Sequence, residues 1–432
     1  MNVKHLQNNV GPAWPVVIYW LLSIAQYSYR YILSVNDTHT SGFGYSDTPW
    51  YLSGIKHVIT AGFIAYCICR RIQGRGNQTY KFGALSSIYL VSLAVGIIIL
   101  GIKLTRPDGA SYEVLQAWLQ TWPYLTLPLL LPACMRPQQI VPTLKAFSEF
   151  GFLIMSLFWA ATVYLYYAEG RYPALSWPGQ LRFGGILDDP NGYAALMALI
   201  IVLTIAFRGR LWVFRLIVCV VMCVMTRSLA GLVVLTVTVT VMAIQRASQM
   251  KGLSISAALL TTGLLIGVLT ALCLPDVQYA LNTLAAEVSE TLLFKHQSIE
   301  LHVTDLVSAP DLGADAAGLD WMVGRDGVSE NFYSWTLTNF GLLGSFFLGG
   351  SLLASMAVLA NRGTGAGMYI LAWALGIVIG SAGIPYLKNF PINMLFWSAI
   401  SVVTQRVSVN ASLRMDRLAS SYQMAPANYP AS

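Results

Sequence analysis

Runs of about twenty consecutive apolar residues follow one another along most of this 432-residue chain. A helix of that length crosses the hydrocarbon core of a bilayer, where only helices and closed barrels satisfy the backbone. Charged residues make up 10% of the sequence and apolar residues 56%. Soluble proteins carry about 25% charged residues, so this chain has too little charge to cover a surface in water. We therefore expect an all-α polytopic integral membrane protein.

The apolar runs predict about twelve transmembrane helices. Their approximate bounds are 14–34, 50–69, 83–103, 113–133, 146–168, 190–207, 211–226, 228–245, 253–274, 332–360, 367–384 and 390–405. The chain thus divides into nine spans over 1–274, a large loop over 275–331, three spans over 332–405 and a tail over 406–432. Shorter loops at 34–49 and 169–189 lie on the same side as the large loop.

The distribution of charge predicts the orientation of these spans. With the N-terminus inside, sixteen of the 26 basic residues but only two of the 19 acids lie on the inner side. This asymmetry follows the positive-inside rule and places both termini in the cytoplasm. If the nearly continuous runs at 211–226 and 228–245 formed one span, Arg246 and Lys251 would lie outside and the charge asymmetry would be lost. The net charge of +7 is therefore explained by basic residues that set the orientation of the spans. No basic run exceeds two residues, so we expect no nucleic-acid partner.

The large outer loop has an amphipathic pattern. Leu281, Leu284, Val288 and Leu292 recur at roughly helical spacing among acidic residues. Such a pattern is typical of helices that lie along a membrane surface. We expect one or two amphipathic helices within 275–331.

Three segments at the outer ends of spans carry the candidate chemistry, and the first surrounds Asp189-Pro190-Asn191. Pro190 suits the first turn of a helix, and the mouth of a helix is an anion site to which Arg171 and Arg182 would add positive charge. Simple capping of the helix by Asp189 explains the same residues.

The second segment is Thr226-Arg227-Ser228, a guanidinium between two apolar runs. An arginine inside a membrane usually faces a cavity or a partner because burying its charge is costly. The alternative is that Arg227 extends to the membrane interface.

The third segment begins at Glu330, where the large loop returns to the membrane. Its carboxylate would be either a base that faces an outer cavity or a cap stabilised by the helix dipole. Gly341 and Gly344, farther along, are expected to permit close helix packing. His296 and Glu300 have a metal-like spacing but no evident third ligand, so we predict no metal site.

Taken in order, these segments resemble the O-antigen polymerase and O-antigen ligase superfamily of bacterial envelope enzymes, often called Wzy-type. Arg182-x-Gly-Gly…Asp189-Pro190-Asn191 is similar to its first outer motif. Thr226-Arg227-Ser228-x-Ala-Gly231-Leu is similar to its Ser-Arg segment, and Glu330-Asn331-Phe-Tyr-x6-Phe-Gly341-Leu-Leu-Gly344 to its distal motif.

The resemblance implies a membrane glycosyltransferase with a GT-C-like fold in the bacterial inner membrane, with the large loop in the periplasm. It implies transfer of a glycan from undecaprenyl diphosphate without metal or cofactor, with a chain-length-regulating co-polymerase as a possible partner. Ligases of the superfamily carry His before the distal Asn, where this chain has Glu330, so the resemblance favours a polymerase. The ligase, which would transfer the glycan to lipid A-core or another acceptor, is the alternative.

The site residues that the resemblance implies are a base and a set of substrate-binding residues. Glu330 is the catalytic base. The substrate-binding residues are Arg182, Arg227, Arg171, Asn191, Asn331 and Tyr333. An arginine that the superfamily carries in its large loop is not obvious here, and Lys295, His296 or Arg325 would have to serve instead.

The chemistry of the residues agrees with this implication. Negative charge that develops on a diphosphate leaving group is stabilised by arginines and a helix mouth, and the attacking sugar hydroxyl needs a base. A transporter or flippase for the same lipid carrier would also show about twelve spans. Such proteins usually carry charges accessible from both sides or repeat symmetry, whereas the inner halves of these spans hold almost no charge.

Overall fold

The computed structural model describes residues 11–34, 50–73, 83–105, 112–169, 190–209, 211–226, 228–249, 332–362, 366–382 and 384–404. Within these ranges the protein is all-α. Its α-helices are α2 (Trp14–Ser34), α3 (Trp50–Ile72), α4 (Ala84–Leu104), α5 (Tyr112–Thr121), α6 (Leu127–Cys134), α7 (Ile140–Glu169), α8 (Pro190–Phe207), α9 (Trp212–Met225), α10 (Leu229–Gln249), α14 (Phe332–Arg362) and α15 (Ala366–Gly380). Two 3₁₀ helices, η1 (Trp122–Thr126) and η2 (Pro137–Gln139), and a last helix, Ile392–Thr404, complete the described part.

These helices coincide with the apolar runs of the sequence. The run at 253–274, the outer loops at 34–49, 169–189 and 275–331 and the tail at 406–432 lie outside the described residues, apart from Ser34 and Glu169 at the edges of two loops. Among the described residues, three helices are long and apolar enough to cross a membrane, namely Ala84–Leu104, Ile140–Tyr164 and Phe332–Ala360. Several shorter apolar helices accompany them. The all-α class is therefore shown for the described residues, while the number of twelve spans stays a prediction.

Large apolar side chains line the outside of the bundle. On α9, Phe214, Ile217, Val221 and Val224 are exposed at helical spacing, and other helices show similar stripes. Soluble proteins rarely expose apolar patches of this extent, because water makes them unfavourable. The exposed stripes are the surface that a multi-pass membrane protein presents to lipid.

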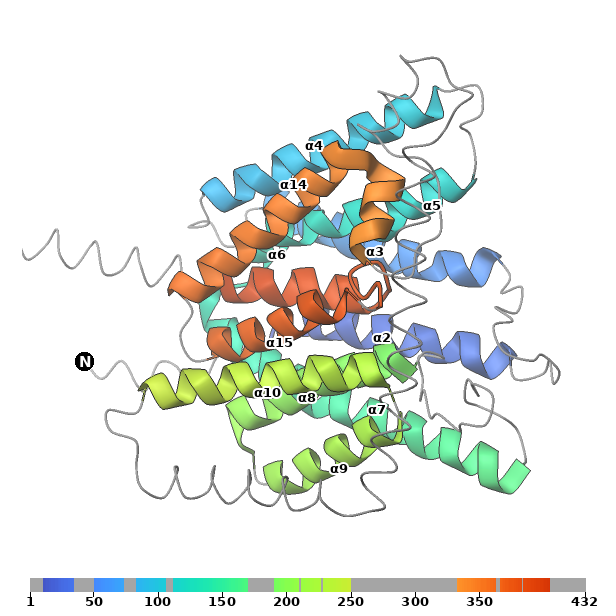
Figure 1. Cartoon of the computed structure of the whole chain (residues 1–432), viewed down its shortest axis with the longest axis vertical. Coiled ribbons are helices and arrows are strands. Elements are labelled where there is room, and N and C mark those ends of the chain that lie inside the picture. Colours follow the sequence, from blue (N-terminus) through green and yellow to red (C-terminus); the bar gives the residue numbers. More distant parts are fainter. Residues whose placement is uncertain are drawn as a thin grey trace, which may run out of the picture.

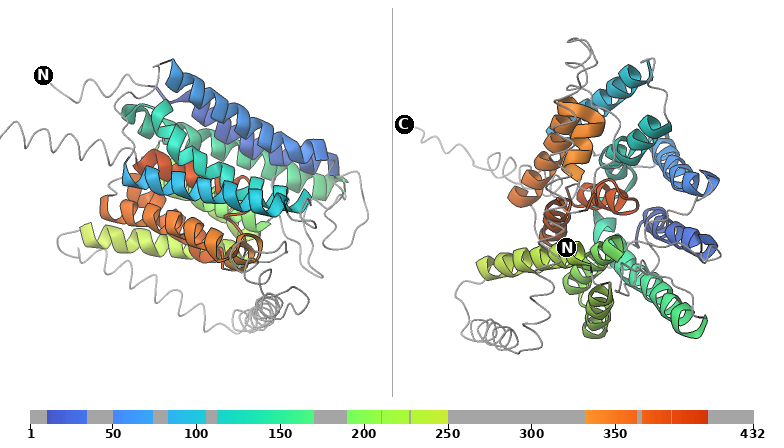
Figure 2. Two further views of the ribbon diagram at one scale, coloured as in Figure 1. Left: turned by 90° about the horizontal axis from the view of Figure 1, so that it is seen from above. Right: turned by 45° about the vertical axis from the view of Figure 1, so that its right-hand side comes forward.

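The last helix occupies the middle of the bundle. Every residue from Ile392 to Val403 is buried. The other helices surround it, and the axes of most of them are roughly aligned along the bundle, whichever way the chain runs (Figures 1 and 2). Helices α8, α10 and α15 form a tightly packed group on one side (Figure 1).

The chain reverses direction between α9 and α10. Near one end of α8, Arg215 of α9 donates to Thr204 Oγ1 at 3.3 Å, and near the other end Tyr193 lies beside Met222. Helix α9 is therefore antiparallel to α8. Helix α10 begins beside the start of α8 and runs along it (Figure 1). The two apolar runs at 211–226 and 228–245 thus form separate antiparallel helices, as the charge distribution predicted.

Basic side chains gather at the end of the bundle that the sequence predicts to be cytoplasmic. Arg215 donates to the Ser148 hydroxyl at 2.7 Å and lies 5.4 Å from the Phe152 ring, joining α9 to α7. The backbone N–H of Ala13 donates to Thr143 Oγ1 at 2.8 Å and ties the start of α2 to the start of α7, beside Lys145. These contacts join helix ends that the predicted topology places on the same side.

The predicted span at 113–133 is not one helix. It consists of α5, η1 and α6, with Pro123 and Pro128 at the starts of the second and third segments. Proline has no N–H to donate, so each one favours the first turn of a new segment over the middle of a long helix. An apolar run gives no sign of such a break, which is why the sequence pattern predicted a continuous helix.

Helix α14 bends at Gly341, whose φ of 62° and ψ of −166° lie outside the helical region (Figure 1). Only glycine adopts this backbone conformation without strain. Gly341 is therefore required for the bend and not for close packing, contrary to the expectation. Gly344 does serve packing, since a Cβ there would lie 2.3 Å from Phe340 Cβ and 3.3 Å from Ile99 Cδ1.

We predict that the 275–331 loop and the C-terminal tail lie on opposite sides of the membrane. In a variant without native cysteines, cysteines placed at Ala316 and Ser420 should react with an impermeant thiol reagent from opposite sides of sealed vesicles. Labelling of both positions from the same side would contradict the predicted topology.

Candidate functional site

Helix ends from all three sequence motifs meet at one end of the bundle. We call this the motif end and define it by the starts of α8, α10 and α14 and the finish of α15. Four described residues mark it: Asn191, Ser228, Phe332 and Ser381. Hydrogen bonds and close side-chain contacts connect these helix ends in pairs.

The first two motifs are joined directly. The Ser228 hydroxyl donates to Asn191 Oδ1 at 2.5 Å and accepts from the backbone N–H of Gly231 at 2.9 Å. Ser228 therefore caps the start of α10 while it holds the start of α8. A Cβ on Gly231 would lie 2.2 Å from Ala194 Cβ, so glycine allows the two helices to cross this closely.

Tyr193 of α8 contacts two further helices near the junction of α8 and α10. Its ring is completely buried, and its hydroxyl lies 3.1 Å from the Met155 carbonyl oxygen and 3.2 Å from Met222 Sδ. The side chain therefore links α8 to α7 and α9. Tyr193 was not among the predicted site residues, although a tyrosine within an otherwise apolar run was an available signal.

The third motif is joined to the end of α15. The backbone N–H of Phe332 donates to the Ser381 carbonyl oxygen at 3.0 Å. The hydroxyl of Tyr333, whose side chain is exposed, donates to the Val378 carbonyl oxygen. One backbone donor at the start of α14 and two backbone acceptors at the end of α15 are thereby paired.

Helix α15 in turn connects the third motif to the first two. A Cβ on Gly380 would lie 2.7 Å from Val234 Cγ2 of α10, and the Trp373 indole N–H donates to the Ala195 carbonyl oxygen of α8 at 3.0 Å. Val234 follows Ser228 by six residues, which is about 9 Å along a helix. The three motifs therefore lie at the same end of one packed group of helices.

Lys388 also lies at this end, in the loop between α15 and the last helix. Its side chain is half-buried, and its Nζ lies 4.9 Å from the centroid of the Trp335 ring of α14. Burial lowers the pKa of Lys388 to about 8. Lys388 was not among the predicted site residues, because nothing in the local sequence distinguishes it from a lysine at the membrane interface.

Of the predicted site residues, Asn191 and Tyr333 belong to the described part of the chain, and both lie at the motif end. The others lie outside the described residues, namely Arg171, Arg182, Arg227, Lys295, His296, Arg325, Glu330 and Asn331. Their roles stay predictions. The nearest described neighbours of Arg227 in the chain are Thr226 and Ser228, and Glu330 precedes Phe332 by two residues.

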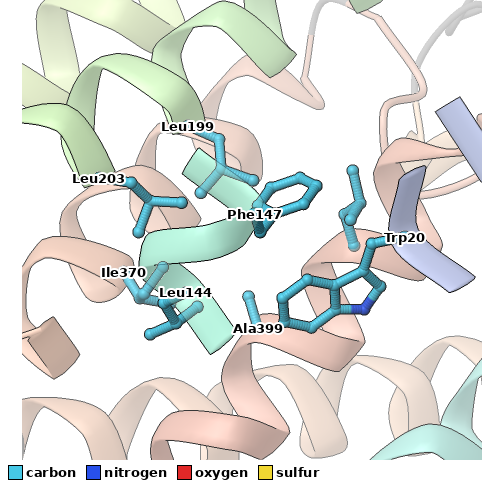
Figure 3. A pocket seen from close by; sticks show the side chains of 8 residues that line it. Trp20, Leu144, Phe147, Leu199, Leu203, Ile370 and Ala399 are labelled. Atoms are coloured by element: carbon cyan, nitrogen blue, oxygen red, sulfur yellow. The ribbon is translucent and has the colours of Figure 1, made fainter. Parts of the chain in front are cut away.

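A small cavity is present elsewhere in the bundle (Figure 3). It lies between Trp20, Leu144, Phe147, Leu199, Leu203, Ile370, Leu395 and Ala399. Its size is about that of one water molecule, and its lining is apolar. Leu203 follows Asn191 by twelve residues, or about 18 Å along α8, so this cavity is separate from the motif end.

Within the part of the chain that the structure describes, no three His, Cys, Asp or Glu side chains come together as metal ligands. Comparison of the chain with protein-family models finds no match, and a search of curated proteins finds none either.

Proposed function

We propose that this protein is a surface-polysaccharide polymerase of the bacterial inner membrane. It transfers a growing glycan from undecaprenyl diphosphate to the next lipid-linked repeat unit at the periplasmic face. The reaction requires neither metal nor nucleotide, because the donor is already activated by its diphosphate.

The observation that carries this proposal is the meeting of three motifs at one end of the bundle. They are separated by up to about 150 residues in the sequence, yet Asn191 bonds Ser228 and α15 packs between α10 and the start of α14. A reaction that needs both a phosphate-binding group and a base requires such convergence. A chain whose motifs served only to cap helices would not require it.

In this proposal Arg182 and Arg227 bind the diphosphate, and Glu330 accepts the proton of the attacking sugar hydroxyl. Arginine suits the leaving group because its planar fork donates two parallel hydrogen bonds to phosphate oxygens. Asn191 and Ser228 are the described residues that adjoin this chemistry. Their mutual hydrogen bond fixes the helix ends from which the arginine-bearing segments extend.

The test is incubation of the purified protein with a lipid-diphosphate repeat unit in the absence of nucleotide and metal. The products are separated by size on a gel. A ladder of glycans that differ by one repeat unit is expected. Unchanged substrate would contradict the polymerase, and transfer of a single glycan to a different lipid acceptor would identify a ligase.

We predict that Arg182→Lys and Arg227→Lys each lower turnover by about ten- to a hundredfold, because lysine cannot replace two parallel hydrogen bonds to phosphate. The yield and melting temperature of the folded protein should stay near those of the wild type. Arg208→Lys, at the opposite end of the bundle, is the matched control and should leave turnover unchanged. Full activity in both variants at the motif end would make these arginines interfacial anchors.

A further inference from the structure

Lys388 is held firmly in place by its surroundings. Its backbone N–H donates to the Pro385 carbonyl oxygen at 2.9 Å. The side-chain amide of Asn393 donates to the Lys388 carbonyl oxygen at 3.3 Å and also to the carbonyl oxygen of Gln120 on α5. The loop is thus fixed to both the last helix and α5, and the direction of the lysine side chain is set by the rigid bundle.

The ammonium group rests on an aromatic platform. Trp335, whose ring is 4.9 Å from Lys388 Nζ, is itself buried against Phe332 and Phe340, with ring centroids 6.2 Å and 5.3 Å away. A ring attracts a cation through its face, but it accepts none of the three ammonium N–H bonds. Toward the described residues, the cation therefore retains donors that the Trp335 ring does not use.

Among the described side chains no carboxylate is available to pair with it. Glu149, whose side chain the structure describes, is exposed at the opposite end of the bundle, and the side chains of Glu113 on α5 and Glu169 on α7 lie outside the described part. The titratable groups with described side chains on the elements packed around Lys388 are the hydroxyls of Tyr333 on α14, Tyr386 in the same loop and Tyr124 on η1. Helix α5 also carries Tyr112 and Glu113, whose side chains lie outside the described part. A half-buried cation in such surroundings is stabilised when an anion binds.

We propose that Lys388 is a diphosphate-binding residue of the donor site, presented by the loop between α15 and the last helix. This inference rests on the proposed function and adds to it a third cation, from a segment that none of the three motifs contains. Trp335 positions the ammonium. Lysine acts there as a point charge for a phosphate oxygen, beside the forked contacts of the arginines.

The position of Trp335 supports this assignment. Trp335 lies one turn into α14, and the same helix begins at Phe332, two residues after Glu330. Since Phe332 bonds to Ser381 at the end of α15, the loop that follows α15 starts beside the third motif. Lys388 is therefore close to the start of α14, the helix that follows the predicted base in the sequence.

A binding experiment tests the inference without requiring catalysis. The full-length protein in phosphatidylcholine nanodiscs is titrated with geranylgeranyl diphosphate and, separately, with uncharged geranylgeraniol. The wild type should bind the diphosphate more tightly, and Lys388→Met should weaken diphosphate binding about tenfold or more while leaving alcohol binding unchanged. Lys388→Arg should bind nearly as the wild type does. Lys145→Met, an exposed lysine at the opposite end, is the control and should have no effect.

Several results would overturn the inference. They are equal diphosphate binding by the wild type and Lys388→Met, or no preference of the wild type for the diphosphate over the alcohol. Displacement of the probe by phosphatidylglycerol in the wild type but not in the Met variant would assign Lys388 to a phospholipid headgroup instead of the donor. If the Met variant does not fold, Lys388→Gln is measured in its place.

The pH dependence of turnover gives a second readout. The pKa of Lys388 in the free protein is about 8, so the ammonium is present below that pH and is lost above it. We expect kcat/KM of the wild type to fall as pH rises through about 8, and Lys388→Arg to lack this fall because a guanidinium stays protonated. The same alkaline fall in the Arg variant would contradict the inference. Diphosphate binding that depends on Lys388 without any polymerisation would refute the proposed function and leave the lysine site in place.

Discussion

Replacing Glu330 by glutamine is expected to lower the rate of glycan transfer by about 10²- to 10⁴-fold, the usual contribution of a general base. Glutamine keeps the size of the side chain and much of its hydrogen bonding, but it cannot accept the proton of the attacking hydroxyl. The rate is measured with the purified protein and a lipid-diphosphate repeat unit. Glu149→Gln, at the opposite end of the bundle, is the matched control and should leave the rate unchanged.

The same variant separates the possible roles of Glu330 in cells. If the protein is a polymerase, Glu330→Gln should still allow a single repeat unit to reach its lipid acceptor, through a separate ligase, while the ladder of longer chains is lost. Loss of the single unit as well would indicate a ligase. If Glu330 only caps a helix, the amide should cost about 1 kcal/mol of stability or less and leave a normal ladder.

Gly231→Ala is expected to destabilise the protein by about 1–3 kcal/mol and to reduce activity strongly. The new Cβ would lie 2.2 Å from Ala194 Cβ, so α8 and α10 must separate at their crossing. The hydrogen bond from Ser228 to Asn191 lies at the same crossing and would lengthen. The measurements are the thermal melting temperature in detergent and turnover of the lipid-linked repeat unit.

A compensating change shows whether this crossing is the cause. Ala194→Gly removes the atom that the new methyl group meets, so the double variant should recover most of the lost stability. Gly349→Ala on α14 is the control, since a Cβ there meets no atom within 4 Å. A Gly231→Ala variant as stable as the wild type would show that the two helices are not in close contact in the membrane.

Much of the fold was predictable because a membrane helix is encoded locally. The length of each apolar run sets the length of its helix, so α2 and α8 occupy the residues that the sequence indicated. The breaks could not be predicted from the same signal. Trp122-Pro123 and Gly341 alter the backbone without altering hydrophobicity, so α5, η1 and α6 were predicted as one span and the bend of α14 was not foreseen.

The candidate site was predictable only in its parts. The sequence identified Asn191, Ser228 and Tyr333 as members of motifs, because polar residues at the ends of apolar runs are conspicuous. It gave no means of seeing that Asn191 bonds to Ser228, which lies 37 residues away. Lys388 was missed for a related reason: its contact with Trp335 joins segments 53 residues apart, and nothing local distinguishes it from an interfacial lysine.

The bend at Gly341 divides α14 into two parts that pack against different helices. Residues 332–340 carry Tyr333 and Trp335, and through Phe332 and Tyr333 they are bonded to α15. Residues 342–362 pack instead against α4, where Ser351 bonds to Ser92 and Ser355 to Tyr89. Because the helix is interrupted at Gly341, the rotational phase of the long part is not imposed on the short one. The lipid-facing side of the long part is therefore free to diverge in evolution without turning the motif-bearing segment away from its partners.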